Sequence, residues 1–213
     1  MFSDAAELHL NCLARIGQQL DARTFTPSGC GCALDAAHTL TAWHVVSPTI
    51  AAGEQIIVYR RDGVYAACPI WSDDREDLCV LRSTGTIRSD ENRVESYPAL
   101  ARALPFVGTP VGTVSLLRLP EEFQGYAVHQ FFSAGHIAAI FPAHDAESLR
   151  LALTPLLVQR GFSGSPVFLQ DGSIAGIVTG FLTFRIEPSE PRYHFTPLVV
   201  PIGRFHSVIL DSL

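Results

Sequence analysis

The sequence has no segment rich in lysine or arginine, and only 17% of its 213 residues are charged. Its formal net charge is −6. A nucleic-acid or anionic-membrane partner requires a basic surface, which this charge balance does not supply. Apolar runs such as residues 104–117 are short and interrupted by Pro and Gly, and none approaches the roughly 18 residues of a membrane span. We therefore exclude nucleic acid and membrane as partners.

The sequence also lacks the signals of a secreted, disulfide-bonded protein. Asp4 and Glu7 stand where a secretory signal would carry positive charge, and no apolar segment of signal-peptide type follows. The cysteines are odd in number: Cys12, Cys30, Cys32, Cys68 and Cys79. Free thiols in a reducing compartment are expected, and thus a cytoplasmic location. Cys30 and Cys32 have no second cysteine pair that would complete a zinc site, so no metal or other cofactor is expected.

The hydrophobic fraction of 47% is ample for a core, and its pattern is that of short strands. Apolar alternation over four to eight residues is interrupted by Gly, Pro or Asp, without an internal repeat. Helical signals are confined to the ends, at residues 4–13 and 201–213. The pattern predicts an all-β protein with a short helix at each end.

Three hairpins are predicted from their turn residues. Residues 30–41 turn around 35–38 and lead into residues 42–46, residues 55–70 turn at Asp62-Gly63, and residues 166–179 turn at 170–172. The polar segment 83–105 is the expected join between two halves. Each half is expected to form a small antiparallel barrel, because closure removes exposed strand edges.

Three short motifs carry candidate chemistry. Ser163 lies in GFSGSPVF (161–168), His44 in TAWHVV (41–46), and Asp77 opens the apolar strand DLCVL (77–81). Taken singly, these are an ordinary turn, a core histidine and a bend residue with neighbouring acids as competitors, at Asp73, Asp74 and Glu76. Together they supply the nucleophile, base and orienting acid that acyl transfer by serine needs. The other seven histidines lack such a motif and are interpreted as structural or surface residues.

The order His, Asp, Ser resembles that of the chymotrypsin-like serine proteases, and the likeness extends over about residues 10–210. Segments 28–46 and 56–81 resemble the Deg/HtrA-type bacterial branch. Segment 161–168 resembles the serine motif of that branch and of bacterial glutamyl endopeptidases, and segment 175–180 resembles the strand lining the specificity pocket.

The resemblance implies one trypsin-like peptidase domain over residues 1–213, built from two six-stranded antiparallel β-barrels. The N-terminal barrel would span about residues 10–95 and the C-terminal barrel about residues 100–200, followed by a C-terminal helix at 201–213. Ser163 would be the nucleophile, His44 the general base, and Asp77 the residue that orients the histidine.

The resemblance also implies an oxyanion hole made by the backbone N–H groups of Gly161 and Ser163. The specificity pocket would be lined by Leu157, Val158, Thr179, Gly180 and Phe181. No acid or histidine stands at these positions, which predicts cleavage after a small or medium apolar residue. Secreted relatives carry an activating aspartate just before the nucleophile, where this chain has Phe162.

The expected function is that of a serine endopeptidase acting on protein or peptide substrates through an acyl-enzyme. Because the cleavage-activated switch is absent, control by a regulatory protein partner or by ordering of residues 159–162 is a further expectation. Two alternatives stay open: a catalytically quiet binding module with the protease fold, and a narrow esterase or amidase using the same three residues.

Overall fold

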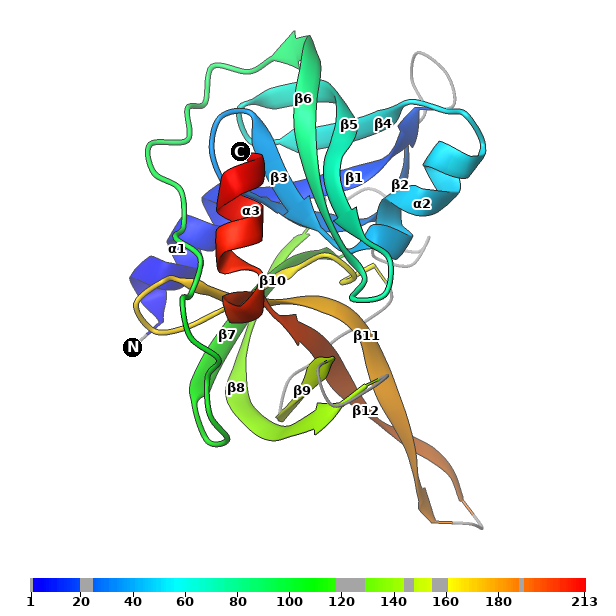
Figure 1. Cartoon of the computed structure of the whole chain (residues 1–213), viewed down its shortest axis with the longest axis vertical. Coiled ribbons are helices and arrows are strands. Elements are labelled where there is room, and N and C mark those ends of the chain that lie inside the picture. Colours follow the sequence, from blue (N-terminus) through cyan, green and yellow to red (C-terminus); the bar gives the residue numbers. More distant parts are fainter. Residues whose placement is uncertain (1, 20–24, 118–128, 144–147, 155–160, 188–189) are drawn as a thin grey trace.

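The computed structural model describes residues 2–19, 25–117, 129–143, 148–154, 161–187 and 190–213. Within these residues, twelve strands form two closed barrels, drawn one above the other in Figure 1. The hydrogen-bonded pairs of neighbouring strands are antiparallel in both barrels. The predicted all-β fold with two six-stranded antiparallel barrels is confirmed.

The first barrel has the strand order β1-β2-β3-β6-β5-β4. Its strands are β1 (Leu13–Gln19), β2 (Phe25–Ala33), β3 (His38–Thr41), β4 (Ile56–Arg60), β5 (Gly63–Asp73) and β6 (Leu78–Ser89). The predicted turn between β2 and β3 is closed by Asp35, whose Oδ1 accepts hydrogen bonds from the backbone N–H groups of Ala37 and His38. The predicted Asp62-Gly63 turn joins β4 to β5.

The second barrel repeats this order six strands later, as β7-β8-β9-β12-β11-β10. Its strands are β7 (Pro110–Leu117), β8 (His129–Pro142), β9 (Leu149–Thr154), β10 (Pro166–Phe168), β11 (Ile174–Glu187) and β12 (Glu190–Pro201). The β10–β11 hairpin is the one predicted from its turn. The β11–β12 hairpin extends well beyond the barrel (Figure 1).

Helices at both ends were predicted, but a third one was not. The end helices are α1 (Ser3–Cys12), the 3-10 turn η2 (Ile202–Arg204) and α3 (His206–Ser212). The additional helix α2 spans Trp43–Ala51. Its valines favour strands by intrinsic propensity. However, Val45, Val46 and Thr49 face one side of the helix and are buried, so the packing of this side outweighs the strand propensity. None of the described helices is both long and apolar enough to cross a bilayer.

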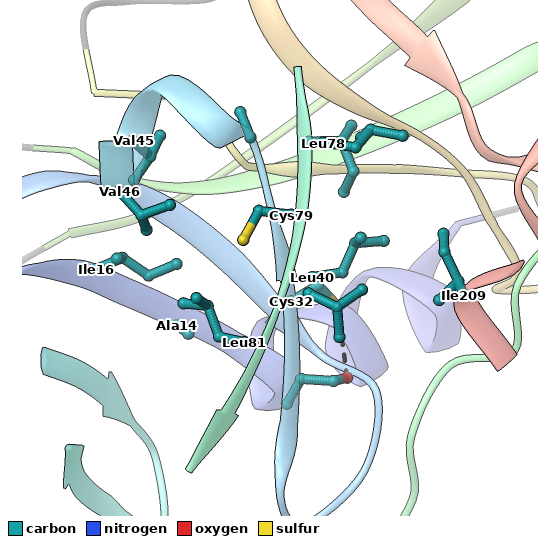
Figure 2. Close-up of a cluster of buried hydrophobic side chains, with 14 of the residues drawn as sticks. Ala14, Ile16, Cys32, Leu40, Val45, Val46, Leu78, Cys79, Leu81 and Ile209 are labelled. Carbon is teal, nitrogen blue, oxygen red and sulfur yellow. Dashed lines mark hydrogen bonds between the residues drawn. The ribbon is translucent and has the colours of Figure 1, made fainter. Parts of the chain in front are cut away.

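One apolar core joins the first barrel to the end of the chain. Figure 2 shows side chains from β1, β2, β3, α2 and β6 converging together with Ile209 of α3. Ile174, Ile177 and Val200 from the second barrel belong to the same cluster. In Figure 1, α3 lies over the first barrel, where it contacts β5, although the helix follows the second barrel in sequence.

A buried ion pair also connects the barrels. Nη1 of Arg150, on β9, lies 2.7 Å from Oε2 of Glu76, in the turn before β6. Ser148 donates to the same carboxylate oxygen at 3.1 Å. Both charged residues are only 7% exposed. The sequence carries a signal for this ion pair. Arg150 is the one charged residue in the apolar strand LRLALT, and a charge that is buried with its strand requires a partner of opposite charge.

The α1 helix is held to the second barrel through a buried histidine. Nε2 of His9 donates to the carbonyl oxygen of Gly172 at 2.9 Å, and its ring stacks on Phe168 with 4.1 Å between centroids. Burial lowers the pKa of His9 to about 4 from its usual 6.5. The neutral ring is therefore the form that the folded protein accommodates.

Replacing Arg150 with Met is expected to lower the free energy of unfolding by about 3–5 kcal/mol, because the Glu76 carboxylate stays buried without its counter-charge. The double variant Glu76→Gln/Arg150→Met should recover much of this loss, since neither charge then remains. Urea unfolding of the two single variants and the double variant measures the coupling. Equal losses in Arg150→Met and the double variant would contradict the buried-pair account.

Protonation of His9 is expected to destabilise the fold at acidic pH. Between pH 6.5 and pH 4 the unfolded chain binds a proton that the folded chain does not, so stability falls as pH is lowered through this range. From pH 7 to pH 4 the wild type should lose about 3 kcal/mol more than His9→Gln, which carries no titrating ring. Unfolding curves across this range provide the test, with the exposed His136→Gln as control. Parallel pH dependences of wild type and His9→Gln would refute it.

Candidate active site

His44 and Asp77 meet at the start of α2. Nδ1 of His44 lies 2.7 Å from Oδ2 of Asp77, and the His44 backbone N–H donates to Oδ1 at 2.8 Å. The carboxylate therefore holds both the ring and the backbone of the histidine. An imidazole that donates its Nδ1 proton in this way presents Nε2 as an acceptor. The His44 side chain is 46% exposed, so that nitrogen is accessible.

The backbone of Asp77 is in the left-handed region, with φ +61°. Aspartate adopts this conformation more readily than most residues. The turn is closed by Asp73, whose Oδ1 accepts from the Glu76 N–H at 2.9 Å, and by the Trp43 N–H, which donates to the Asp77 carbonyl. The competing acids thus have other places: Asp73 closes the turn, Glu76 pairs with Arg150, and Asp74 is exposed.

Ser163 lies in a loop that packs against both barrels. Its carbonyl oxygen accepts from the Cys30 N–H of β2 at 2.8 Å. The next residue, Gly164, donates to the Val178 carbonyl of β11 at 2.8 Å. Gly164 has φ +84°, and a Cβ there would lie 1.9 Å from the Cys30 carbonyl oxygen. Only glycine fits this position, for reasons of both conformation and space.

The loop comes close to α2 next to His44. A Cβ placed on Gly29 would lie 2.7 Å from the Ser163 carbonyl oxygen and 2.7 Å from Cγ2 of Val45, the neighbour of His44. Ser163 and α2 therefore both closely approach Gly29 where its side chain would be. Among the described residues, no hydrogen bond joins Ser163 Oγ to His44. In ligand-free sites such bonds are often long and tighten when substrate binds.

The residues predicted to flank Ser163 have distinct environments. Gly161 is exposed with φ +98°, whereas Phe162 is 1% exposed and packs in the core of the second barrel, with its ring centroid 5.5 Å from that of Phe131. Phe162 was noted in the sequence only as a missing aspartate. Its position shows a structural role: it anchors the loop between the exposed Gly161 and the half-buried Ser163.

The predicted pocket residues are only partly within the described structure. Thr179 and Gly180 are half-buried and Phe181 is exposed, directly after the point where β11 pairs with the Ser163 loop at Val178. A Cβ on Gly180 would meet no atom within 4 Å. Leu157 and Val158 lie outside the described residues.

The five cysteines are free thiols, as predicted. Cys68 is half-buried and the other four are buried. Burial raises the pKa of Cys12 and Cys79 to about 12, and that of Cys32 well above its usual value. These three thiols are therefore unreactive small core residues.

Comparison with known proteins agrees with the two-barrel fold and identifies the family. A family model described as a trypsin-like peptidase domain matches residues 29–177, a range that contains His44, Asp77 and Ser163. A solved structure of Rv3671c from M. tuberculosis H37Rv, described as an inactive form with a serine-to-alanine mutation, is similar in fold with a TM-score of 0.65. Its sequence identity is 15%, over 97% of this chain and 89% of that chain. No curated protein matches the sequence. Because the family model covers more than half of the chain, the protein belongs to the trypsin-like peptidase domain family.

Proposed function

We propose that this trypsin-like peptidase is a serine endopeptidase in which Ser163 is the nucleophile, His44 the general base and Asp77 the orienting acid. The observation that carries the proposal is the pair of hydrogen bonds that the ring and the backbone N–H of His44 donate to the Asp77 carboxylate. A carboxylate in that position selects the tautomer with a free Nε2 and stabilises the imidazolium that forms during the reaction. Placement in the Deg/HtrA or glutamyl-endopeptidase branch stays a prediction.

In this mechanism Ser163 Oγ attacks the carbonyl carbon of the scissile peptide bond while His44 Nε2 takes its proton. The tetrahedral intermediate collapses when the histidine gives that proton to the leaving amine, which leaves an acyl-enzyme. Water then attacks the ester with its proton passing to His44, and the acid product departs as Ser163 Oγ regains its hydrogen.

The oxyanion would be stabilised by the backbone N–H groups of Gly161 and Ser163. The positive φ of Gly161 and the burial of Phe162 support this assignment, because an anchored side chain separates the two residues whose N–H groups would serve as donors. Such donors act without reorganisation at the moment of reaction, and the loss of one typically lowers the rate about 10²- to 10³-fold.

The substrate residue before the cleaved bond would lie against Thr179, Gly180 and Phe181 of β11. The pairing of Val178 with the Ser163 loop supports this, because it brings the following residues of β11 next to the nucleophile. Leu157 and Val158 would complete the pocket. A small or medium apolar side chain suits residues that carry no charge.

The Ser163→Ala variant is expected to lose covalent labelling by a fluorophosphonate and about 10⁶-fold of peptidase kcat. Asp77→Asn should retain Ser163 but lose about 10⁴-fold, because the amide favours the wrong histidine tautomer. Gel fluorescence and hydrolysis of a peptide library measure the two effects. The exposed Ser207→Ala serves as a matched control and should behave as wild type.

Equal labelling of wild type and Ser163→Ala would eliminate the nucleophile assignment. Labelling of Ser163 without cleavage of any peptide would favour the binding module, the narrow esterase or amidase, or control by a protein activator. A panel of simple esters and amides, with and without cell extract, separates these three.

The peptide library also tests the specificity proposal. Cleavage is expected after alanine, valine or leucine in preference to lysine, arginine or glutamate, because the pocket residues offer no counter-charge. An apolar pocket discriminates by about 1–3 kcal/mol per methylene, so the preference among apolar residues should be graded. Preferred cleavage after a charged residue would overturn the pocket assignment without affecting that of Ser163.

A further inference from the structure

Three buried side chains form a line of hydrogen bonds beside the Ser163 loop. Ser165 Oγ donates to Ser115 Oγ at 2.9 Å, Ser115 Oγ lies 3.5 Å from Cys30 Sγ, and the Cys30 thiol donates to the Gly161 carbonyl oxygen at 3.4 Å. Each group has one proton. Since Ser165 donates to Ser115 and Cys30 donates to Gly161, the proton of Ser115 is left for the cysteine sulfur, and every donor is used. We call this line the Ser165–Ser115–Cys30 relay.

The relay links the two ends of the loop that carries the nucleophile. Gly161 stands two residues before Ser163, and Ser165 two residues after it. Ser115 belongs to β7 of the second barrel, whereas Cys30 belongs to β2 of the first. The loop and the relay therefore form a ring that closes across the junction of the barrels. Cys30 contacts this loop twice, since its backbone N–H also donates to the Ser163 carbonyl oxygen.

A restraint on Gly161 matters because open space lies where its side chain would be. Its φ is +98°, and a Cβ there would meet no atom within 4 Å. A cavity of about 220 Å³ lies alongside, lined in part by Gly29, Cys30, Leu116 and Gly161 itself. Packing on this side therefore leaves room for the glycine to rotate, and the hydrogen bond from the thiol restrains its carbonyl group.

The carbonyl group of Gly161 lies in the peptide that joins it to Phe162, whereas its N–H lies in the preceding peptide. The two peptides are linked by φ and ψ of Gly161. With the peptide to Phe162 held by the thiol and by the buried Phe162 side chain, these two angles alone set the direction of the Gly161 N–H. Two other thiols have partners away from this loop: Cys12 donates to the Ser96 carbonyl, and Cys32 lies near His9 Nδ1 and the Ala33 carbonyl.

We propose that the Ser165–Ser115–Cys30 relay is a positioning network. It holds the peptide that joins Gly161 to Phe162, and so fixes the base from which φ and ψ of Gly161 direct its N–H for transition-state stabilisation. This rests on the proposed function, because it assigns the Gly161 N–H to the oxyanion hole. The relay residues touch no reacting atom and act through Gly161.

The experiment compares Ser115→Ala, Cys30→Ala and Cys30→Ser with Thr113→Val. Thr113 is a matched control: it is a buried residue on the same strand, and its hydroxyl donates to the Pro166 carbonyl at 2.8 Å without touching the relay. Ser115→Ala and Cys30→Ala are expected to lower kcat about 10- to 100-fold with KM changed less than threefold, since a misdirected oxyanion donor costs somewhat less than a lost one. Cys30→Ser keeps a donor and should recover part of kcat. Thr113→Val should lose comparable thermal stability while keeping the wild-type kcat.

A second readout does not depend on catalysis. Amide hydrogen exchange of the segment 161–165, measured in a Ser163→Ala background, should be faster in Ser115→Ala and Cys30→Ala and unchanged in Thr113→Val. The outcomes separate the two proposals. If the wild type is active and the relay variants lose no more kcat than Thr113→Val, the relay proposal is overturned while the proposed function stands. If the wild type neither reacts with the fluorophosphonate nor cleaves peptides, the proposed function fails; unchanged amide exchange of 161–165 in the relay variants would then refute the relay separately.

Discussion

The hydrogen bond from the Cys30 N–H to the Ser163 carbonyl joins the two barrels at the point on which the active site depends. It requires the backbones of β2 and the Ser163 loop to approach closely, and Gly164 makes this approach possible because a Cβ there would lie 1.9 Å from the Cys30 carbonyl oxygen. Each barrel supplies part of the site: His44 and Asp77 from the first, Ser163 from the second. Any shift between the barrels would therefore alter the distance between the proposed nucleophile and the proposed base.

Two further contacts also join the two barrels near the candidate site. The Glu76–Arg150 ion pair attaches the turn that ends in Asp77 to β9 of the second barrel, and the Ser165–Ser115–Cys30 relay attaches the Gly161 carbonyl to β2 of the first. Both use polar groups that are almost wholly buried, where a lost partner leaves an expensive unsatisfied group. Polar groups at the junction thus specify the relative placement of the barrels more sharply than apolar packing alone would.

The two barrels have the same strand order although the sequence shows no internal repeat. Barrel closure depends on alternating inward apolar residues and on turns of suitable length, which many different residues satisfy. Local patterns of this kind were sufficient to predict the hairpins, the end helices and the all-β class. They were insufficient for α2, because the burial of Val45, Val46 and Thr49 depends on strands distant in the sequence that pack against them.

The sequence by itself determined the order of His44, Asp77 and Ser163, the glycines that shape the loop around the serine, and the short strands and turns, because each of these is expressed by neighbouring residues. The tertiary structure alone decided that Glu76 and Arg150 pair in a buried position, that Phe162 anchors the loop, and that the Cys30 thiol meets the Gly161 carbonyl. These features arise where segments far apart in the chain meet, and no local pattern records which side chains will face each other across two closed barrels.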